Sequence, residues 1–489
     1  EKDLPLFLLT TVFYSLFLIL YRFSPHLWYL LRNISLGFSV QAGAVVGNEM
    51  TLGPTALGMP ITISVVCYCV SLFSLICREN GKKGNTIPAF LTILGLIAMN
   101  AAYLWLQEPM VKAVHFFNTE WNPTPLDFQA VLLVLLLVPL YPVTRKITLR
   151  EVPPEFPLIH LKGAVFAIFL VLIAALALTS HPRGHIPRGD ILFCDRGANW
   201  AVPVYGKTYG QHSAGMFGML PNYLKLRGYQ TRITKDTVTP KSLEGAGVVV
   251  VFNPVRNFSG PEKQLIHKFI EDGGSLLIAG DHTDVTGVMG PINDLLTPFN
   301  ISLNFDTALP TASGWVNSLE KRPHPITVGL EKDYEASIWV GASLNISLPA
   351  RPVIVGTRGW ADMGNYLNKK RAFLGNYKRS SDEQLGDVVL VAESVCGKGK
   401  VLVFGDTSTF QNGVLTSGHL FLDRIFAWLS SRENLYYPGW QFIFALILLG
   451  AAGSLLRGIP GTMLLVLCLI AAHLPLWTQK TSEVLKTSE

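Results

Sequence analysis

Long apolar runs in this chain fall into two groups, separated by a segment of ordinary polarity at residues 180–435. A helix needs about 20 apolar residues to cross a bilayer, so each run predicts a membrane span. The run 130–143 is short and is also compatible with a half-membrane helix. The sequence thus predicts an all-α polytopic membrane domain of about seven helices, with spans at 4–21, 61–77, 88–106, 130–143, 161–179, 440–456 and 461–477.

The composition agrees with a mixture of membrane and soluble parts. With 49% hydrophobic residues, 15% charged residues and a mean hydropathy of +0.35, the chain is too apolar for a purely soluble protein and too polar for a helix bundle alone. The expected domains are 1–179, with about five spans and an outer loop at 33–60, then the soluble domain 180–435, and 436–489, a hairpin of two spans with a short outer tail.

The basic residues of the short loops predict the orientation. They follow the second and sixth runs and lie between the fourth and fifth, on one side of the expected membrane: Arg78, Lys82, Lys83, Arg145, Lys146, Arg150, Lys162 and Arg457. The positive-inside rule then places the N-terminus in the cytoplasm. We therefore expect a multi-pass protein of the plasma (inner) membrane, prokaryotic in type, whose large domain and C-terminus are extracytoplasmic.

This location sets the expected partners, which are the lipid bilayer and other membrane or envelope proteins. A homo-oligomer stays open. The net charge of +6 is attributed to the topogenic loops, and no Lys/Arg stripe with interleaved aromatic residues indicates nucleic acid. The loop 33–60 is compatible with a hairpin, a partly re-entrant segment or an ordinary ectoloop.

Two covalent features remain open. Sequons on the expected outer side would be glycosylated in a eukaryotic or archaeal source, at Asn33, Asn257, Asn300 and Asn345. Cys194 and Cys396 lie in the soluble domain, where two buried thiols are favoured over a disulfide. The first run shows no small-residue cleavage pattern, which favours a retained anchor over a removed signal peptide.

The soluble domain alternates between strand and helix patterns. The run 247–252 is apolar on both faces, which is typical of a central parallel strand. The alternation predicts an open, mostly parallel, flavodoxin-like α/β sheet with helices on both faces. Strands are expected at 190–194, 247–252, 275–280, 351–355, 388–395 and 400–404, with a tight hairpin at 396–399. Helices are expected at 213–227, 259–270, 291–299 and 419–431, and a long polar excursion at 361–387.

Polar residues follow the predicted strands, where ligands bind in open α/β sheets. They are Asp195, Arg196, His212, Ser213, Asn253, Asp281, His282, Asp284 and Asp406. One interpretation is a ligand site, and another is a divalent metal ion at Asp281, His282 and Asp284, which would polarise a substrate or activate water. In the third, Asp281 and Asp406 accept backbone N–H groups and Ser213 caps a helix.

Several motifs, in order along residues 190–432, resemble the glutamine-amidotransferase-like domains of the gliding-motility and intraflagellar-transport (GIFT) type. They are YGQHSAGMFG at 209–218, IEDGGSLLIAG at 270–280, NISLNFD at 300–306, HPI at 324–326 and GKGKVLVFGD at 397–406. The resemblance implies a class I amidotransferase-like fold. It also implies a domain that commonly lacks catalysis and serves in envelope machines, transporter accessories or large assemblies.

The sequence of one turn indicates whether the nucleophile of an amidotransferase is present. An amidotransferase places a cysteine on the sharp turn after the third strand, where a histidine activates the thiolate. Here that turn reads Gly-Asp-His-Thr-Asp at 280–284, with neither cysteine nor serine. We therefore expect no catalytic residue, no cofactor, and a non-catalytic accessory, scaffold or ligand-binding subunit of a cell-envelope complex for transport, export or surface assembly. The alternative is a metal-assisted hydrolase of an envelope carbohydrate or peptide.

Overall fold

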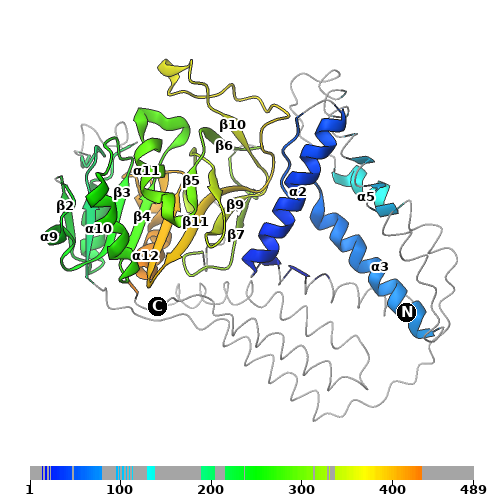
Figure 1. Ribbon diagram of the computed structural model, residues 1–489, viewed down its shortest axis with the longest axis horizontal. Coiled ribbons are helices and arrows are strands. Elements are labelled where there is room, and N and C mark those ends of the chain that lie inside the picture. The colour runs from blue at the N-terminus through cyan, green and yellow to red at the C-terminus, as the bar shows by residue number, and fades with distance from the viewer. Residues whose placement is uncertain are drawn as a thin grey trace, which may run out of the picture. The chain divides into compact units, whose positions relative to one another are not determined.

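The computed structural model in Figure 1 describes residues 189–431 except 204–214, 236, 312–313, 328–329 and 331–335, together with 24–46, 49–79, 129–137 and scattered positions between 14 and 113. The chain divides into two compact units. The first joins Glu1–His181 to Tyr437–Glu489, and the second is Pro182–Tyr436. The strand ends that the sequence marks as a ligand edge all belong to the second unit.

The described helices of the first unit correct the membrane prediction. They are α2 (Pro25–Val46), α3 (Met59–Glu79) and α5 (Gln129–Leu137). Across the part of the chain that the structure describes, no helix is both long enough and apolar enough to cross a membrane. The predicted all-α polytopic membrane domain is therefore wrong, and so is the multi-pass plasma-membrane location built on it.

Several of the other predicted spans fall on residues that the structure does not describe. The runs 161–179, 440–456 and 461–477 lie outside the described residues, as do most positions of 4–21 and 88–106.

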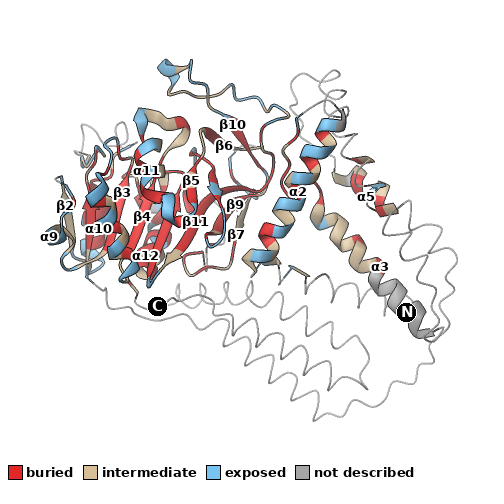
Figure 2. Ribbon diagram, in the orientation of Figure 1, coloured by how far each residue is buried: buried red, intermediate tan, exposed pale blue. Residues whose placement is uncertain are grey.

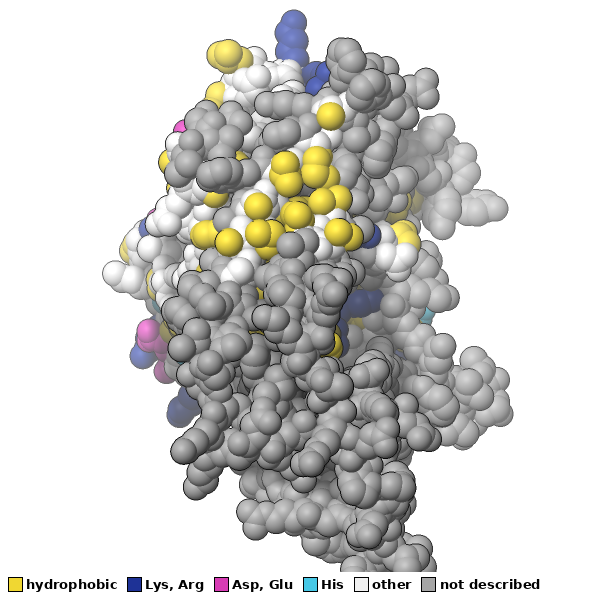
Figure 3. Space-filling view, turned by 90° about the vertical axis from the view of Figure 1, so that its right-hand side faces the viewer, with side chains coloured by type: hydrophobic (Ala, Val, Ile, Leu, Met, Phe, Trp, Pro, Cys, Tyr) yellow, Lys and Arg dark blue, Asp and Glu magenta, His cyan; other side chains and the backbone are white. Residues whose placement is uncertain are grey.

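The described helices of this unit expose apolar side chains, among them Leu30, Ile34, Val40 and Val134. A second view shows apolar side chains gathered in one patch (Figure 3).

Helix α2 takes in much of the segment that the sequence assigns to an outer loop at 33–60. It begins after Ser24, whose Oγ accepts a hydrogen bond from Leu27 N at 3.3 Å, and Pro25 occupies the first turn, where a missing N–H costs nothing. The chain then folds back, since Leu52 N donates to Ser39 Oγ at 3.1 Å. Residues 33–46 are therefore helical, and Asn33 is an exposed helix residue.

An eight-stranded mixed sheet forms the centre of the second unit, in the order β2-β1-β3-β4-β12-β11-β9-β7. Neighbours from β2 to β12 pair in parallel, whereas β11 is antiparallel to both β12 and β9, and β7 is antiparallel to β9. The strands are β1 (Asp190–Cys194), β2 (Thr231–Thr234), β3 (Ala246–Phe252), β4 (Ser275–Ala279), β7 (Leu319–Lys321), β9 (Arg351–Gly356), β11 (Val388–Cys396) and β12 (Gly399–Phe404).

The expected mostly parallel sheet is corrected to this mixed one. The tight hairpin at 396–399 is confirmed, and it reverses the chain from β11 to β12. The five parallel strands keep a doubly wound order, in which ligands usually meet the carboxyl edge. Strands β2 and β7 have only four and three residues, too few for an alternation pattern to be recognised.

Helices flank the sheet. They are α8 (Met219–Leu226), the short α9 (Pro240–Leu243), α10 (Gly260–Glu271), α11 (Met289–Leu296) and α12 (Leu415–Ser430). Helix α10 begins close to the predicted position, with a capping box formed by Ser259 and Glu262. Helix α8 starts later than the predicted 213–227. Gly218 lies so close to the preceding chain that a Cβ there would be 2.3 Å from Trp200 O.

The main core lies between the sheet and helices α8 and α12. Figure 2 shows the central strands buried along their length. Phe252 is fully buried and stacks on Phe410, with ring centroids 4.7 Å apart, while Phe404 meets the same ring edge-on at 5.0 Å. Aromatic side chains bury large areas and so contribute much of the hydrophobic stabilisation here. Because β12 takes part in this core, the position of its carboxyl end is fixed by packing.

Two small antiparallel pairs lie beside the main sheet. One joins β5 (Ile301–Leu303) to β8 (Leu344–Ile346), and the other joins β6 (Asp306–Pro310) to β10 (Gly359–Met363). The predicted polar excursion begins inside β10 and continues as a loop that extends beyond the sheet (Figure 1). This loop returns to the sheet at β11.

Lys400 holds the carboxyl end of α12. Its side chain is buried, and Nζ donates to Trp428 O at 2.7 Å, Ser431 O at 2.9 Å and Ser431 Oγ at 2.7 Å.

Lys400→Met is expected to lower the free energy of unfolding by about 2–3 kcal/mol, because the last helix carbonyls lose a charged donor. Chemical denaturation measures the change. Lys398→Met, at an exposed position of the same hairpin, is the control, expected within about 0.5 kcal/mol of wild type. Equal effects of the two substitutions would contradict the capping role.

Candidate functional site

The carboxyl ends of β3, β4 and β12 meet at one level of the sheet. Phe252 pairs in register with Ala279, which in turn pairs with Phe404, so the chain leaves three neighbouring strands side by side. The residues that follow include Asn253, Asp281 and Asp406. The structure thus brings together three of the predicted site residues.

Asp281 is bound on several sides. Its Oδ1 accepts a hydrogen bond from His282 N at 2.9 Å, and its Oδ2 accepts one from Thr407 Oγ1 at 3.4 Å. The side chain of Asn253 also hydrogen-bonds to it. Burial raises the pKa of Asp281, although His282 and these hydrogen bonds act in the opposite direction. The carboxyl group therefore has few free positions for a ligand.

Asp406 is buried more deeply. Its Oδ2 accepts a hydrogen bond from Trp339 N at 2.5 Å, and its Oδ1 accepts one from Ser408 N at 2.8 Å. Burial raises the pKa of Asp406 to about 7, with a further contribution from the nearby carboxyl of Asp281. Two close carboxyl groups in a desolvated site resist ionising together. Near neutral pH, Asp281 and Asp406 thus form a pair that retains a proton.

The turn after β4 is conformationally strained. Thr283, Asp284 and Thr286 adopt φ values of 46°, 53° and 60°, in the left-handed region that side chains with a Cβ seldom occupy. Thr283 Oγ1 donates to Ala372 O at 2.6 Å, so it must accept from His282 Nδ1, which lies 2.8 Å away. Thr283 is fully buried, and its only proton is already engaged. It is therefore not positioned to act as a nucleophile.

A second segment of the chain crosses directly over the end of β12. Ala342 N donates to Gly405 O at 2.7 Å. A Cβ on Gly405 would lie 1.9 Å from Ala342 O, and one on Gly341 would lie 2.3 Å from Gly405 O, so both positions need glycine. The crevice beside them has essentially no space for a water-sized molecule, whereas ligand pockets usually measure about 300–1,000 Å³. It is lined by Ala308, Trp315, Ile338, Trp339, Gly341, Ala342, Leu390, Gly405 and Asp406.

Two of the three metal candidates, Asp281 and Asp284, accept hydrogen bonds from backbone N–H groups, and the ring of His282 contacts neighbouring side chains. Asp284 Oδ1 accepts from Met289 N at 2.8 Å at the start of α11, and His282 Nε2 lies 3.7 Å from Asp281 Oδ1. Within the described ranges, no three His, Cys, Asp or Glu side chains are grouped so that they could hold a metal ion. The arrangement favours the interpretation in which these residues stabilise loops.

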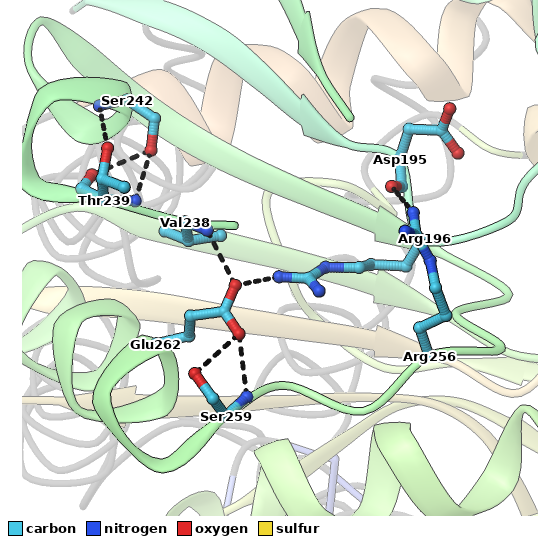
Figure 4. Close-up of polar contacts among 8 residues, drawn as sticks. All are labelled: Asp195, Arg196, Val238, Thr239, Ser242, Arg256, Ser259 and Glu262. Atoms are coloured by element: carbon cyan, nitrogen blue, oxygen red, sulfur yellow. Dashed lines mark hydrogen bonds and ion pairs between the residues drawn. The ribbon is translucent and has the colours of Figure 1, made fainter. Parts of the chain in front are cut away.

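The loop after β1 carries a buried ion pair (Figure 4). Arg196 pairs with Glu262, and both side chains are almost completely buried. Glu262 also accepts hydrogen bonds from Val238 N at 2.7 Å and from Ser259 N and Oγ, each at 2.8 Å. Burial opposes its ionisation, but the hydrogen bonds from Ser259, Val238 and Arg196 outweigh burial and lower its pKa. Arg196 therefore joins the loop after β1 to α10.

Asp195 faces away from this pair in Figure 4. Its Oδ1 accepts from Gly197 N at 3.0 Å, and its carbonyl oxygen accepts from Arg256 Nη2 at 2.9 Å. These contacts make Asp195 a loop-stabilising residue. His212 and Ser213, predicted to lie nearby, fall outside the described residues.

The remaining predicted positions have the following environments. Asn257, Asn300 and Asn345 are exposed. Cys194 and Cys396 are both free thiols, and burial raises the pKa of Cys194 to about 12.

His324, in the HPI motif, is a buried structural residue. Its Nδ1 accepts from Ile326 N at 3.2 Å, so Nε2 carries the proton and donates to Glu393 Oε2 at 3.1 Å. The ring also packs edge-on against Trp428, with centroids 4.6 Å apart. Both ring nitrogens are engaged inside the core, which leaves none for a substrate.

Sequence reasoning missed a second group of buried acids on the β6–β10 pair. Asp306 accepts hydrogen bonds from Ser343 N at 2.7 Å and from Ser343 Oγ, and burial, with a contribution from Asp362, raises its pKa to about 6. Asp362 in turn accepts from Asn376 N at 3.3 Å and Tyr377 N at 3.1 Å. Asp306 ends the motif at 300–306, which could have drawn attention to it. Nothing in its spacing indicated burial.

Comparison with known proteins gives a coarse assignment. A family model described as "Domain of unknown function (DUF4350)" matches residues 218–421, less than half of the chain. No curated protein matches. At a coarse level, this match and the topology of the second unit fit the GIFT-like fold expected from the motifs. The family description names no amidotransferase.

The chain shows similarity to solved structures that include the "mmIFT52 N-terminal domain", at 18% identity over 50% of this chain and 99% of that one, with a TM-score of 0.35. "Cytoplasmic Protein STM1381 from Salmonella typhimurium LT2" is similar at 14% identity over 50% and 100% of the two chains, with a TM-score of 0.30. "Cytoplasmic Protein STM3548 from Salmonella typhimurium" shows 12% identity over 48% and 97%, with a TM-score of 0.29. Likeness at these values supports no statement about function.

Proposed function

We propose that the second unit is a non-catalytic assembly domain, a scaffold or accessory module that binds another protein. The observation that carries this proposal is the closed carboxyl edge of the sheet. The backbone N–H groups of Trp339 and Ser408 donate hydrogen bonds to the two carboxylate oxygens of Asp406. The N–H of Ala342 donates to Gly405 O, at the end of β12 where a ligand would approach. The turn after β4 also offers no cysteine or serine.

A small-ligand-binding domain is the second candidate, and Asn253 is the observation that favours it. Its Oδ1 is buried without a hydrogen-bond partner among the described residues, and its backbone adopts a φ of 40°. A buried acceptor without a donor is costly, so a bound donor would stabilise it. The crevice nearby is nevertheless small, and we therefore rank the assembly role first.

Enzymatic assays of the full chain test the proposal. Purified protein is incubated with glutamine and with panels of peptides and oligosaccharides, with and without Mg²⁺, Mn²⁺ or Zn²⁺, beside the variants Asp281→Asn and His282→Ala. We expect no turnover above buffer by any of the three proteins and no stoichiometric metal. Turnover that both substitutions abolish, while circular dichroism shows both variants folded, would overturn the proposal and support the metal-assisted hydrolase.

A further inference from the structure

Basic residues are concentrated in the first part of the loop between β10 and β11. Residues 363–381 contain five lysine and arginine residues and no aspartate or glutamate, while Asp382, Glu383 and Asp387 follow before β11. Four of these cations are exposed, namely Lys369, Lys370, Arg371 and Lys378. None of the four forms an ion pair with another described residue. The loop therefore presents a local positive field to solvent.

Large apolar side chains are exposed among these cations. Leu367 is 95% exposed, Tyr366 68% and Met363 56%. Exposed apolar groups ringed by polar ones mark interaction sites, because solvent contact costs free energy that a partner can recover. Tyrosine and arginine are also enriched in the residues that dominate protein interfaces.

The loop is held in a defined conformation. Tyr366 stacks on Phe305 with centroids 3.9 Å apart and planes inclined by 9°. Asn365 N donates to Phe373 O at 2.7 Å, and Phe373 N donates to Asn368 O at 3.0 Å, which closes the tip on itself. The buried carboxylate of Asp362 anchors the return of the loop through two backbone N–H groups. Because the loop is already ordered, a partner that binds it causes little further loss of conformational entropy, which favours affinity.

We propose that residues 363–379, here called the basic loop, dock an acidic segment of a partner protein that carries apolar side chains. The inference rests on the proposed assembly function and names the surface through which it acts. Carboxylates of the partner would pair with Lys369, Lys370 and Arg371, and its apolar side chains would cover Tyr366 and Leu367. Complementary charge steers encounter and sets orientation, while the apolar contact supplies most of the affinity.

Selection from a displayed library of random 12-residue peptides tests the proposal on the full chain. We expect selected peptides to be enriched in Asp and Glu around Leu, Phe or Trp. The variant Leu367→Ser/Lys369→Glu/Lys370→Glu should weaken their binding at least tenfold, measured by fluorescence anisotropy. Binding should also weaken as salt is raised from about 50 to 500 mM, because screening removes the charge contribution.

A control variant with one Lys→Glu change in place of two lies on α8. Leu226 is 88% exposed and Lys225 is exposed beside it, so Leu226→Ser/Lys225→Glu changes the same kinds of side chain away from the basic loop. This variant should bind the selected peptides as wild type does. The proposal is overturned if no peptide is selected, if the peptides lack acidic enrichment, or if both variants bind equally. Loop-dependent binding of single-stranded DNA or of phosphatidylserine vesicles in place of peptides would overturn it too.

These outcomes are distinct from failure of the proposed function. An enzyme would reveal itself by turnover that depends on Asp281 and His282, whatever binds the basic loop. Peptide binding that is insensitive to the loop variant, without any turnover, would instead leave the assembly role standing and reject this surface.

Discussion

Glu262→Gln is expected to lower the free energy of unfolding by about 3–5 kcal/mol, the largest effect of any single substitution considered. The glutamine leaves Arg196 as a buried charge without its counter-ion. The NH2 group of the glutamine would also face backbone N–H donors that in the wild type bind the carboxylate oxygens of Glu262. Removing one partner of a buried pair costs far more than the pair contributes. Urea denaturation of the full chain, followed by tryptophan fluorescence and circular dichroism, measures the change.

The double variant Arg196→Met/Glu262→Met separates this cause from simple loss of packing. It removes both charges together, so we expect it to be more stable than Glu262→Gln alone. Arg227→Met is a surface comparison, because the Arg227–Asp423 pair is partly exposed and should contribute about 1 kcal/mol or less. If Glu262→Gln cost no more than Arg227→Met, the buried pair would not hold the β1 loop to α10.

Asp406→Asn is expected to change how stability depends on pH. The folded protein keeps a proton on Asp406 up to about pH 7, whereas an unfolded aspartate loses it near pH 4. The folded state therefore binds more protons between these values, so the free energy of unfolding falls as pH rises from about 4 to 7. The asparagine has no such proton, and its stability relative to wild type should rise by up to about 4 kcal/mol across this window.

Asp306→Asn gives the comparison, because the pKa of Asp306 is raised only to about 6. The free energy of unfolding of Asp306→Asn relative to wild type should therefore stop rising at about pH 6, one unit lower than for Asp406→Asn. Denaturation curves at half-unit steps from pH 4 to 8 measure both. A difference between Asp406→Asn and wild type that does not vary with pH would show that Asp406 ionises normally in the folded protein.

The main elements of the second unit could be predicted because local patterns determine them. The buried run of β3, the start of helix α10 and the Gly-Lys-Gly hairpin between β11 and β12 each depend on neighbouring residues, and the structure confirms all three. The direction of β9 and β7 could not be predicted, since pairing across the sheet depends on the path of the long connections. Short strands leave too few residues for periodicity to be detected.

Part of the candidate site could also be predicted from local patterns. Strand ends place Asn253, Asp281 and Asp406 together, because parallel strands end at one edge. What fills that edge comes from distant segments, 337–342 and the chain near Ala372, and no local pattern indicates that they cross it. The membrane prediction failed differently, because apolar content was taken as sufficient for a span.

Hydrogen exchange at the carboxyl edge tests most directly whether the chain closes its own ligand site. The amides of Trp339 and Ala342 donate to Asp406 and to Gly405 O, and the amide of Val403 lies within β12. If the edge is closed, the amides of Trp339 and Ala342 should exchange about as slowly as that of Val403, since all three open only with the core. Exchange of Trp339 and Ala342 a thousandfold faster than Val403 would show that the edge opens readily, and would contradict a domain that binds through other surfaces.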